Sequence, residues 1–111
     1  MERTTFDDEA TRIAWNHAAE AWRHFVESGV DYTRRLLHGP ALLEVCGDVR
    51  GLDVVDLGCG HGYFTRLLAQ RGAHVEGVEL AERLVAYAQQ EEEREPLGIR
   101  YHHTSAADIG E

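Results

Sequence analysis

Residues 54–64 read VVDLGCGHGYF, and this stretch decides the fold of the chain. It begins with a short run rich in β-branched apolar side chains, which predicts a buried strand. Three closely spaced glycines then predict a tight loop, and the spacing of Phe64, Leu67 and Leu68 predicts a helix directly after it. A strand, a glycine-rich loop and a helix N-terminus open a nucleotide-binding βαβ unit, because the loop lets a ligand approach the free N–H groups of the helix.

The spacing of the glycines and two acids indicates which ligand this unit binds. The dinucleotide fingerprint GxGxxG places its third glycine three residues after the second, whereas the glycines here are spaced evenly by two. Asp56 precedes the first of them and would repel a pyrophosphate but attract the ammonium of an amino acid. Residues 73–79 predict a second strand that ends at Glu79, 21 positions after Gly58, close to the spacing of about 20 at which an acid binds ribose hydroxyls. This pattern indicates a nucleoside joined to an amino acid.

The motifs DLGCGHG at 56–62 and GVELAERLVAYA at 77–88 resemble the first two motifs of class I S-adenosylmethionine-dependent methyltransferases. Residues 98–109 resemble the third strand and the adenine-contacting turn of that family, and residues 15–45 resemble the leader of its bacterial small-molecule members. The resemblance implies an α/β, Rossmann-like fold with S-adenosylmethionine as cofactor and a small molecule as methyl acceptor. The family's sheet order is 3-2-1-4-5-7-6, of which this sequence has strands 3-2-1.

The resemblance also implies roles for individual residues toward the cofactor. Asp56 attracts the methionyl ammonium, directly or through water, and Glu79 accepts hydrogen bonds from both ribose hydroxyls. Tyr32 or Arg35 contacts the methionyl carboxylate, unless these two residues are only solvated surface groups. Glu79, in turn, has the alternative of being an exposed acid at a strand end. The full set of expected cofactor-binding residues is Asp56, Gly58, Cys59, Gly60, Gly62, Glu79, Leu80, Ser105, Ala106, Asp108 and Tyr32.

The adenine side of the expected site departs from the usual pattern of the family. Ser105-Ala106 stands where an Asp-Ala pair is commoner. By resemblance, the Ala106 N–H meets a ring nitrogen of adenine, Ser105 or Asp108 lies near its exocyclic amine, and Leu80 lies against its face. No residue is identified as a catalytic base, because the family's acceptor-side groups come largely from segments that follow its third strand.

Composition excludes several classes of partner. The chain has 111 residues, 43% of them hydrophobic, and a net charge of −9 without a basic patch, which argues for a packed domain and against nucleic-acid binding. No apolar run approaches the roughly 20 residues that span a bilayer, and the charged N-terminus is not a signal peptide. Cys46 and Cys59 are lone thiols, which indicates a reducing, cytoplasmic location. The seven histidines are spread over several expected elements without metal-ligand spacing, and His102 and His103 point to opposite faces of one expected strand, so the sequence predicts no metal site.

The N-terminal part predicts helices. Residues 6–28 predict an amphipathic helix that ends at Gly29. We expect its apolar stripe to cover the sheet; the alternative, which the resemblance to methyltransferases also implies, is that this segment folds over the cofactor and contacts the ligand. The members of that stripe are Trp15, Ala18, Ala19, Trp22, Phe25 and Val26, with Glu20, Arg23 and Glu27 on the opposite face. Residues 31–37 predict a short second helix, and residues 41–46 predict a third that follows Pro40. Further helices are expected over 63–71 and 81–93, and a third strand from Gly98 onward. We place the boundary between an N-terminal helical segment and the half-domain that binds the cofactor after residue 47.

The first strand, residues 53–57, is apolar on both faces, as in a central strand, yet it is expected at a free edge. Either the chain is the N-terminal part of a longer methyltransferase, or a partner chain, such as a second copy in a homo-oligomer, pairs with this edge. The sequence therefore predicts methyl transfer to a small molecule, with this chain carrying the cofactor-binding half. The alternatives are a non-catalytic, methyltransferase-like binding or assembly module and a nicotinamide-dependent oxidoreductase, the latter opposed by the glycine spacing and by Asp56.

Overall fold

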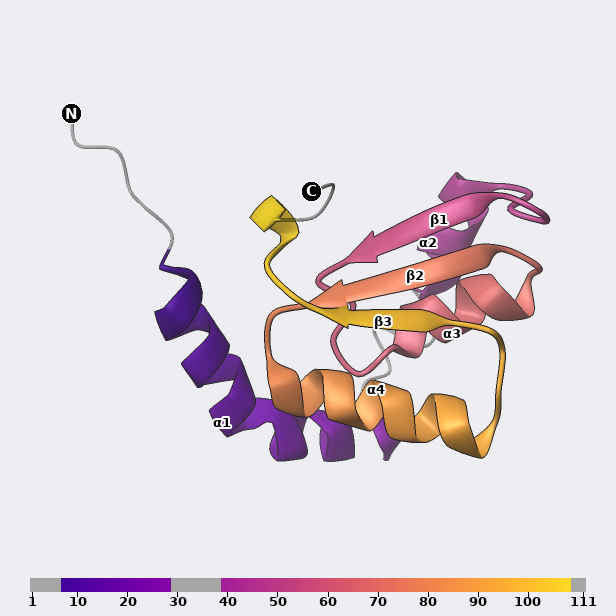
Figure 1. Cartoon of the computed structure of the whole chain (residues 1–111). Coiled ribbons are helices and arrows are strands. Elements are labelled where there is room, and N and C mark those ends of the chain that lie inside the picture. Colours follow the sequence, from indigo (N-terminus) through magenta and orange to yellow (C-terminus); the bar gives the residue numbers. More distant parts are fainter. Residues whose placement is uncertain (1–6, 29–38, 109–111) are drawn as a thin grey trace.

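Three parallel strands form the sheet at the centre of the molecule (Figure 1). The computed structural model describes residues 7–28 and 39–108. The elements are, in order, α1 (Asp8–Glu27), α2 (Gly39–Cys46), β1 (Asp53–Leu57), α3 (Tyr63–Gln70), β2 (His74–Glu79), α4 (Glu82–Arg94), β3 (Arg100–His103) and a 3-10 turn (Ala106–Asp108). The expected strands and helices in this part of the chain are confirmed, most of them to within one or two residues of the predicted ends.

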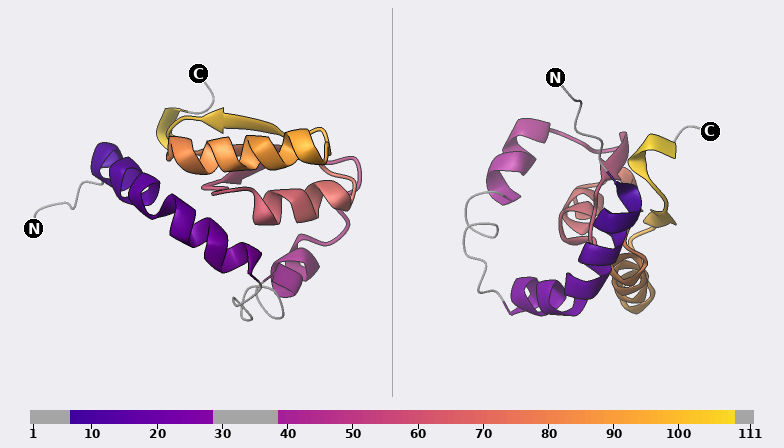
Figure 2. Two further views of the ribbon diagram at one scale, coloured as in Figure 1. Left: turned by 90° about the horizontal axis from the view of Figure 1, so that it is seen from below. Right: turned by 90° about the vertical axis from the view of Figure 1, so that its left-hand side faces the viewer.

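The sheet has the order β1-β2-β3, with Asp56 opposite Gly77 and Glu79 opposite His103. The predicted strand order 3-2-1 is therefore confirmed. Two successive right-handed crossovers place α3 and α4 on the same face of the sheet (Figures 1 and 2). All three strands end at one edge, where the loops after β1, β2 and β3 meet.

The core lies between the sheet and the helices. One buried cluster joins Leu68 of α3, Val75 of β2 and Leu43 of α2. α3 is also tied to the end of α4 by Arg66, a buried guanidinium that donates to the Glu95 carbonyl at 2.8 Å and lies 3.5 Å from the Glu92 carboxylate. These contacts hold the start of α3 firmly against the rest of the fold.

The first helix, α1, packs differently from the prediction. It packs along α4 and not over the sheet (Figure 2). Trp15 and Phe25 of the expected apolar stripe stay 43% and 42% exposed, and Ala18 is exposed too. The prediction was wrong because it assigned every charged residue to solvent, whereas Arg23 lies over the Tyr87 ring of α4, 4.0 Å from its centroid.

β1 lies at an open edge of the three-stranded sheet, as predicted. Its apolar side chains Val55 and Leu57 are 51% and 55% exposed. Such an edge presents unpaired backbone groups next to apolar side chains. Gly29, the expected helix at 31–37, Tyr32 and Arg35 lie outside the described residues, and the domain boundary after residue 47 stays a prediction.

Candidate functional site

The glycine loop between β1 and α3 is tied to the middle strand. The N–H groups of Gly58 and Cys59 both donate to the Val78 carbonyl, at 2.8 and 3.0 Å. The loop then turns through glycines with positive φ and reaches α3 at Gly62, which has a φ of +93°. Residues with a Cβ rarely adopt this conformation, so the glycines keep the loop close to the carboxyl end of β2.

Glu79 connects this loop to the start of α4. Its side chain is buried, only 8% exposed, and its two carboxylate oxygens accept different backbone N–H groups. Oε1 accepts from Gly60 and Oε2 from Ala81, both at 2.9 Å. A carboxylate oxygen has a second lone pair, so Glu79 can accept further hydrogen bonds from a ligand without releasing the loop.

A cavity of about 540 Å³ opens beside Glu79 and the glycine loop. This volume falls within the roughly 300–1,000 Å³ typical of small-molecule sites. Its walls come from five places in the described part of the chain: the glycine loop, the end of β2, the start of α4, the turn after β3 and the helix α1. The lining residues are Asp8, Thr11, Trp15, Trp22, Gly58, Cys59, Gly60, His61, Val78, Glu79, Leu80, Leu84, Thr104, Ser105, Ala106 and Ala107.

The structure brings most of the predicted site residues to this cavity. Those lining it are Gly58, Cys59, Gly60, Glu79, Leu80, Ser105 and Ala106. Asp56, in β1, and Gly62, at the junction of the loop with α3, are not part of the cavity wall. Asp108 is exposed in the turn after β3, also outside the wall, and Tyr32 is not among the described residues. The roles of these residues toward a cofactor stay predictions.

Asp56 lies in β1, two residues before the first glycine of the loop, and its Oδ2 accepts a hydrogen bond of 2.8 Å from the Thr65 hydroxyl in the first turn of α3. Burial raises the pKa of Asp56, the Thr65 hydrogen bond partly offsets this effect, and the negative charge of Glu79 adds to it. Asp56 therefore contributes negative potential close to the loop while its side chain is held by α3.

Cys59 and Tyr101 fill the space between the loop and the sheet. A Cβ on Gly77 would lie 2.7 Å from the Tyr101 ring and 2.9 Å from the Cys59 sulfur, so only glycine fits there. Burial, together with the charges of Asp56 and Glu79, raises the pKa of the Cys59 thiol to about 12. A thiol with this pKa stays protonated and is not a nucleophile at neutral pH.

α1 contributes to the cavity, which was the alternative expectation for its apolar stripe. Thr11, Trp15 and Trp22 line one side of it, and the two indole rings meet edge to face with centroids 5.9 Å apart. The helical spacing of the two tryptophans left both contact with the sheet and contact with a ligand open, and it did not indicate that Thr11 lines the cavity. Thr104 and Ala107, on either side of the predicted Ser105-Ala106 pair, lie in the stretch that resembles the adenine-contacting turn but were not predicted as site residues, and they line the cavity too.

The comparisons with known proteins agree with this geometry. A family profile described as a methyltransferase domain matches residues 54–111, just over half of the chain. The chain belongs to the methyltransferase domain family. The matched region contains the glycine loop, Glu79 and the turn after β3, so it covers most of the cavity wall. The predicted class I, Rossmann-like methyltransferase fold is thereby confirmed.

Two curated relatives of this methyltransferase domain carry the name ubiquinone biosynthesis O-methyltransferase. The protein from Leptothrix cholodnii is 48% identical over 46 residues, which are 41% of this chain and 20% of that protein. The protein from Roseobacter denitrificans is 40% identical over 57 residues, covering 51% of this chain and 23% of that protein. The chain thus spans about a fifth to a quarter of the length of these relatives.

Among solved structures, the magnesium protoporphyrin IX methyltransferase from Synechocystis, with bound S-adenosylmethionine, superposes with a TM-score of 0.73 at 29% identity. The superposition covers 98% of this chain and 60% of that one. It includes the N-terminal part that the family profile leaves out. The arrangement of α1 against the methyltransferase domain therefore has a counterpart in a protein that was solved with the cofactor.

Two further properties bear on what the site holds. Residues 7–28 and 39–108 contain no group of three or more His, Cys, Asp or Glu side chains placed to hold a metal ion. No helix in the same two ranges has both the length and the apolar character needed to cross a membrane. The residues that line the cavity carry backbone N–H and C=O groups, hydroxyls, carboxylates, the His61 imidazole, the Cys59 thiol and the indole N–H groups of Trp15 and Trp22.

Proposed function

We propose that this chain carries the cofactor-binding half of an S-adenosylmethionine-dependent methyltransferase that acts on a small molecule. The observation that carries the proposal is the buried Glu79 carboxylate, which faces the cavity while it holds the Gly60 and Ala81 N–H groups. An acid at the end of the second strand is suited to bind the hydroxyls of a ribose. The glycine loop next to it leaves room for an amino-acid moiety. Membership of the methyltransferase domain family supports the same cofactor.

The residues of the cavity have distinct tasks in this proposal. Glu79 accepts the two ribose hydroxyls, and the backbone of Gly58 and Gly60 leaves room for the methionyl part. Leu80 packs against adenine, and the backbone of Ser105-Ala106 contacts its edge. Bound S-adenosylmethionine supplies an electrophilic methyl group on its sulfonium. The protein orients the ligand and, with the indole rings of α1, excludes water from it.

Binding calorimetry tests the cofactor assignment. We expect the chain to bind S-adenosylmethionine and S-adenosylhomocysteine, and NAD at least about 100-fold more weakly, because Asp56 and Glu79 disfavour a pyrophosphate. Incubation with methyl-labelled S-adenosylmethionine and a metabolite extract then separates an enzyme from a binding module, since only an enzyme yields a labelled small molecule. Equal affinity for NAD, or no binding of either adenosyl ligand, would overturn the proposal.

We expect Asp56→Asn to raise the stability of the folded protein and to weaken cofactor binding. The fold raises the pKa of Asp56 above its ordinary value of 3.8. At neutral pH, where Asp56 is ionised, its buried charge therefore lowers the stability of the folded protein. We expect the variant to be more stable than the parent at about pH 7, with an advantage that shrinks toward about pH 4, where Asp56 takes up its proton. We also expect weaker binding of S-adenosylmethionine, since the attraction for its ammonium is lost. Urea unfolding at both pH values and calorimetry check the two effects; a parent as stable as the variant at both would contradict the first.

We further propose that two copies of the chain associate through β1. Val55 and Leu57 are half exposed at its open edge, and a lysine in such a strand opposes pairing. We expect concentration-dependent sedimentation of the parent chain and monomeric behaviour of Val55→Lys. Leu42→Lys, at a similarly exposed apolar position on α2, is the matched control and should behave as the parent does. A parent that stays monomeric would contradict the proposal.

A cytoplasmic location is part of the same proposal. Among the described residues the two cysteines are free thiols, Cys46 exposed and Cys59 half-buried. Free thiols persist in a reducing compartment. Fractionation of the producing cells tests this, and recovery from an oxidising compartment would contradict it.

A further inference from the structure

One face of α1 packs along α4. Arg12, Asn16, Ala19, Arg23 and Val26 recur at steps of four and three residues, which places them on one side of the helix. These are also positions where α1 loses solvent exposure: Ala19 and Val26 are buried and the three polar residues are partly buried. The neighbouring stripe, with Thr11, Trp15 and Trp22, lines the cavity. Docking of α1 on α4 therefore determines where the cavity wall lies.

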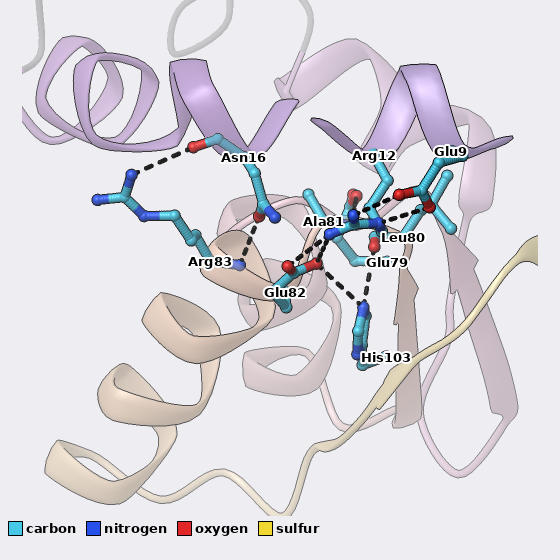
Figure 3. Close-up of polar contacts among 9 residues, drawn as sticks. All are labelled: Glu9, Arg12, Asn16, Glu79, Leu80, Ala81, Glu82, Arg83 and His103. Carbon is cyan, nitrogen blue, oxygen red and sulfur yellow. Dashed lines mark hydrogen bonds and ion pairs between the residues drawn. The ribbon is translucent and has the colours of Figure 1, made fainter. Parts of the chain in front are cut away.

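The start of α4 depends on α1 for its cap. Its N-cap residue is Ala81, which has no side chain that can accept a hydrogen bond. In its place, Asn16 Oδ1 accepts the Arg83 N–H at 2.8 Å, and the Arg83 guanidinium lies 3.4 Å from the Asn16 carbonyl (Figure 3). The cap that a Ser, Thr, Asp or Asn at the N-cap would supply from within a helix comes here from another helix.

An ion pair stands next to this cap. The Arg12 guanidinium donates to both carboxylate oxygens of Glu82, at 2.5 and 2.7 Å, and also to Glu9 (Figure 3). The hydrogen bonds from Arg12 hold the pKa of Glu82 at about 2, so this carboxylate is charged at any physiological pH. From β3, His103 Nε2 lies 3.4 Å from Glu82 and 3.0 Å from the Leu80 carbonyl.

These contacts fall on the residues that directly follow Glu79. Glu79 accepts the Ala81 N–H, Arg12 pairs with Glu82, and Asn16 caps at Arg83. The turn that positions the proposed ribose-binding acid is thus the turn to which α1 is fastened. None of Arg12, Asn16 and Glu82 lines the cavity itself.

We infer that Asn16, Arg12 and Glu82 are positioning residues that fasten α1 over the cofactor cavity and set how fast the cofactor leaves it. This inference rests on the proposed function. When α1 is docked, its indole rings close one side of the cavity; when it is undocked, that side is open to solvent. Dissociation through the undocked state scales with the population of that state, even when the docked state predominates.

Stopped-flow dissociation of S-adenosylhomocysteine tests the inference, with the fluorescence of Trp15 and Trp22 as the signal because both line the cavity. Asn16→Ala removes the cap, and we expect the ligand to dissociate about fivefold faster. This factor assumes that the stability usually lost with an N-cap goes wholly into the undocking of α1. The double variant Asn16→Ala/Arg12→Met, which also loses the ion pair, should dissociate faster still. The unfolding midpoint of each variant is measured separately by circular dichroism. A midpoint well above the temperature of the stopped-flow assay excludes unfolding as the cause of faster dissociation.

Two control variants separate positioning from a general loss of structure. Asn16→Gln keeps an amide that can accept the Arg83 N–H and adds no negative charge beside Glu82, so it should dissociate at about the parent rate. Glu91→Gln breaks the ion pair with Arg94 at the opposite end of α4 and should also leave the rate unchanged. Unchanged rates in Asn16→Ala and in the double variant, with the parent binding normally, would overturn this inference alone. A parent that binds neither adenosyl ligand would overturn the proposed function, and the inference with it.

Discussion

Glu79→Ala should lose the ligand and a substantial part of the stability together. The substitution leaves the Gly60 and Ala81 N–H groups without their acceptor, and we expect a loss of about 2–4 kcal/mol in the free energy of unfolding. It also removes the acid proposed to accept both ribose hydroxyls, so binding of S-adenosylhomocysteine should weaken by about 100-fold. Urea unfolding and calorimetry measure the two effects.

Two further variants show which part of this effect belongs to the site. Glu79→Gln keeps one accepting oxygen, so we expect a smaller loss of stability. Binding should still be weak, because the NH2 group that replaces the second oxygen cannot accept a ribose hydroxyl. Glu76→Gln changes an acid of the same strand that does not line the cavity and contacts His102 at 3.0 Å. It should bind as the parent does. Parent-like affinity in Glu79→Ala would refute the assigned role of this carboxylate.

Gly60→Ala should mainly weaken ligand binding, whereas Gly62→Ala should mainly lower stability, although both change a glycine of the same loop. Both have positive φ, so each alanine carries a backbone penalty of about 1–2 kcal/mol. A Cβ at Gly62 would lie 2.4 Å from the Tyr101 hydroxyl, whereas a Cβ at Gly60 meets no atom within 4 Å. We expect Gly62→Ala to cost about 2–4 kcal/mol in total. Gly60→Ala should stay folded but bind the adenosyl ligand about tenfold or more weakly, because the added methyl group stands at the cavity wall.

Tyr101→Phe tests the steric explanation. The hydroxyl of Tyr101 is buried and has no hydrogen-bond partner among the described residues, so its removal should leave stability unchanged or raise it slightly. In combination with Gly62→Ala, the same change should recover part of the lost stability, because the nearest atom is gone. Thermal unfolding of the four proteins measures this coupling. An additive pair, with no recovery, would show that the cost of Gly62→Ala is only that of its backbone conformation.

Local patterns in the sequence, with the family resemblance that they carry, predicted the strands, the glycine loop and seven of the sixteen described residues that line the cavity. β1, α3 and β2 are encoded by residues adjacent in the chain, so their types and ends follow from spacing and from glycine. The meeting of the Gly60 loop with Glu79 was predictable as well, because neighbouring parallel strands end at the same edge of a sheet. The side-chain partners of Asp56 and Tyr101 were not predicted, since they depend on the register between strands and on the contact with α3.

The sequence by itself determined that this chain forms a βαβαβ unit of the methyltransferase domain family, with an acid after β2 next to a glycine loop. Only the tertiary structure decided that α1 docks on α4 and completes the cavity. The physical reason is that Arg12, Asn16 and Arg23 are polar residues, which a hydrophobic pattern assigns to solvent. Their partners Glu82, Arg83 and Tyr87 come more than 60 positions later in the chain. A cap or an ion pair between two helices can be seen only once folding has brought the helices together.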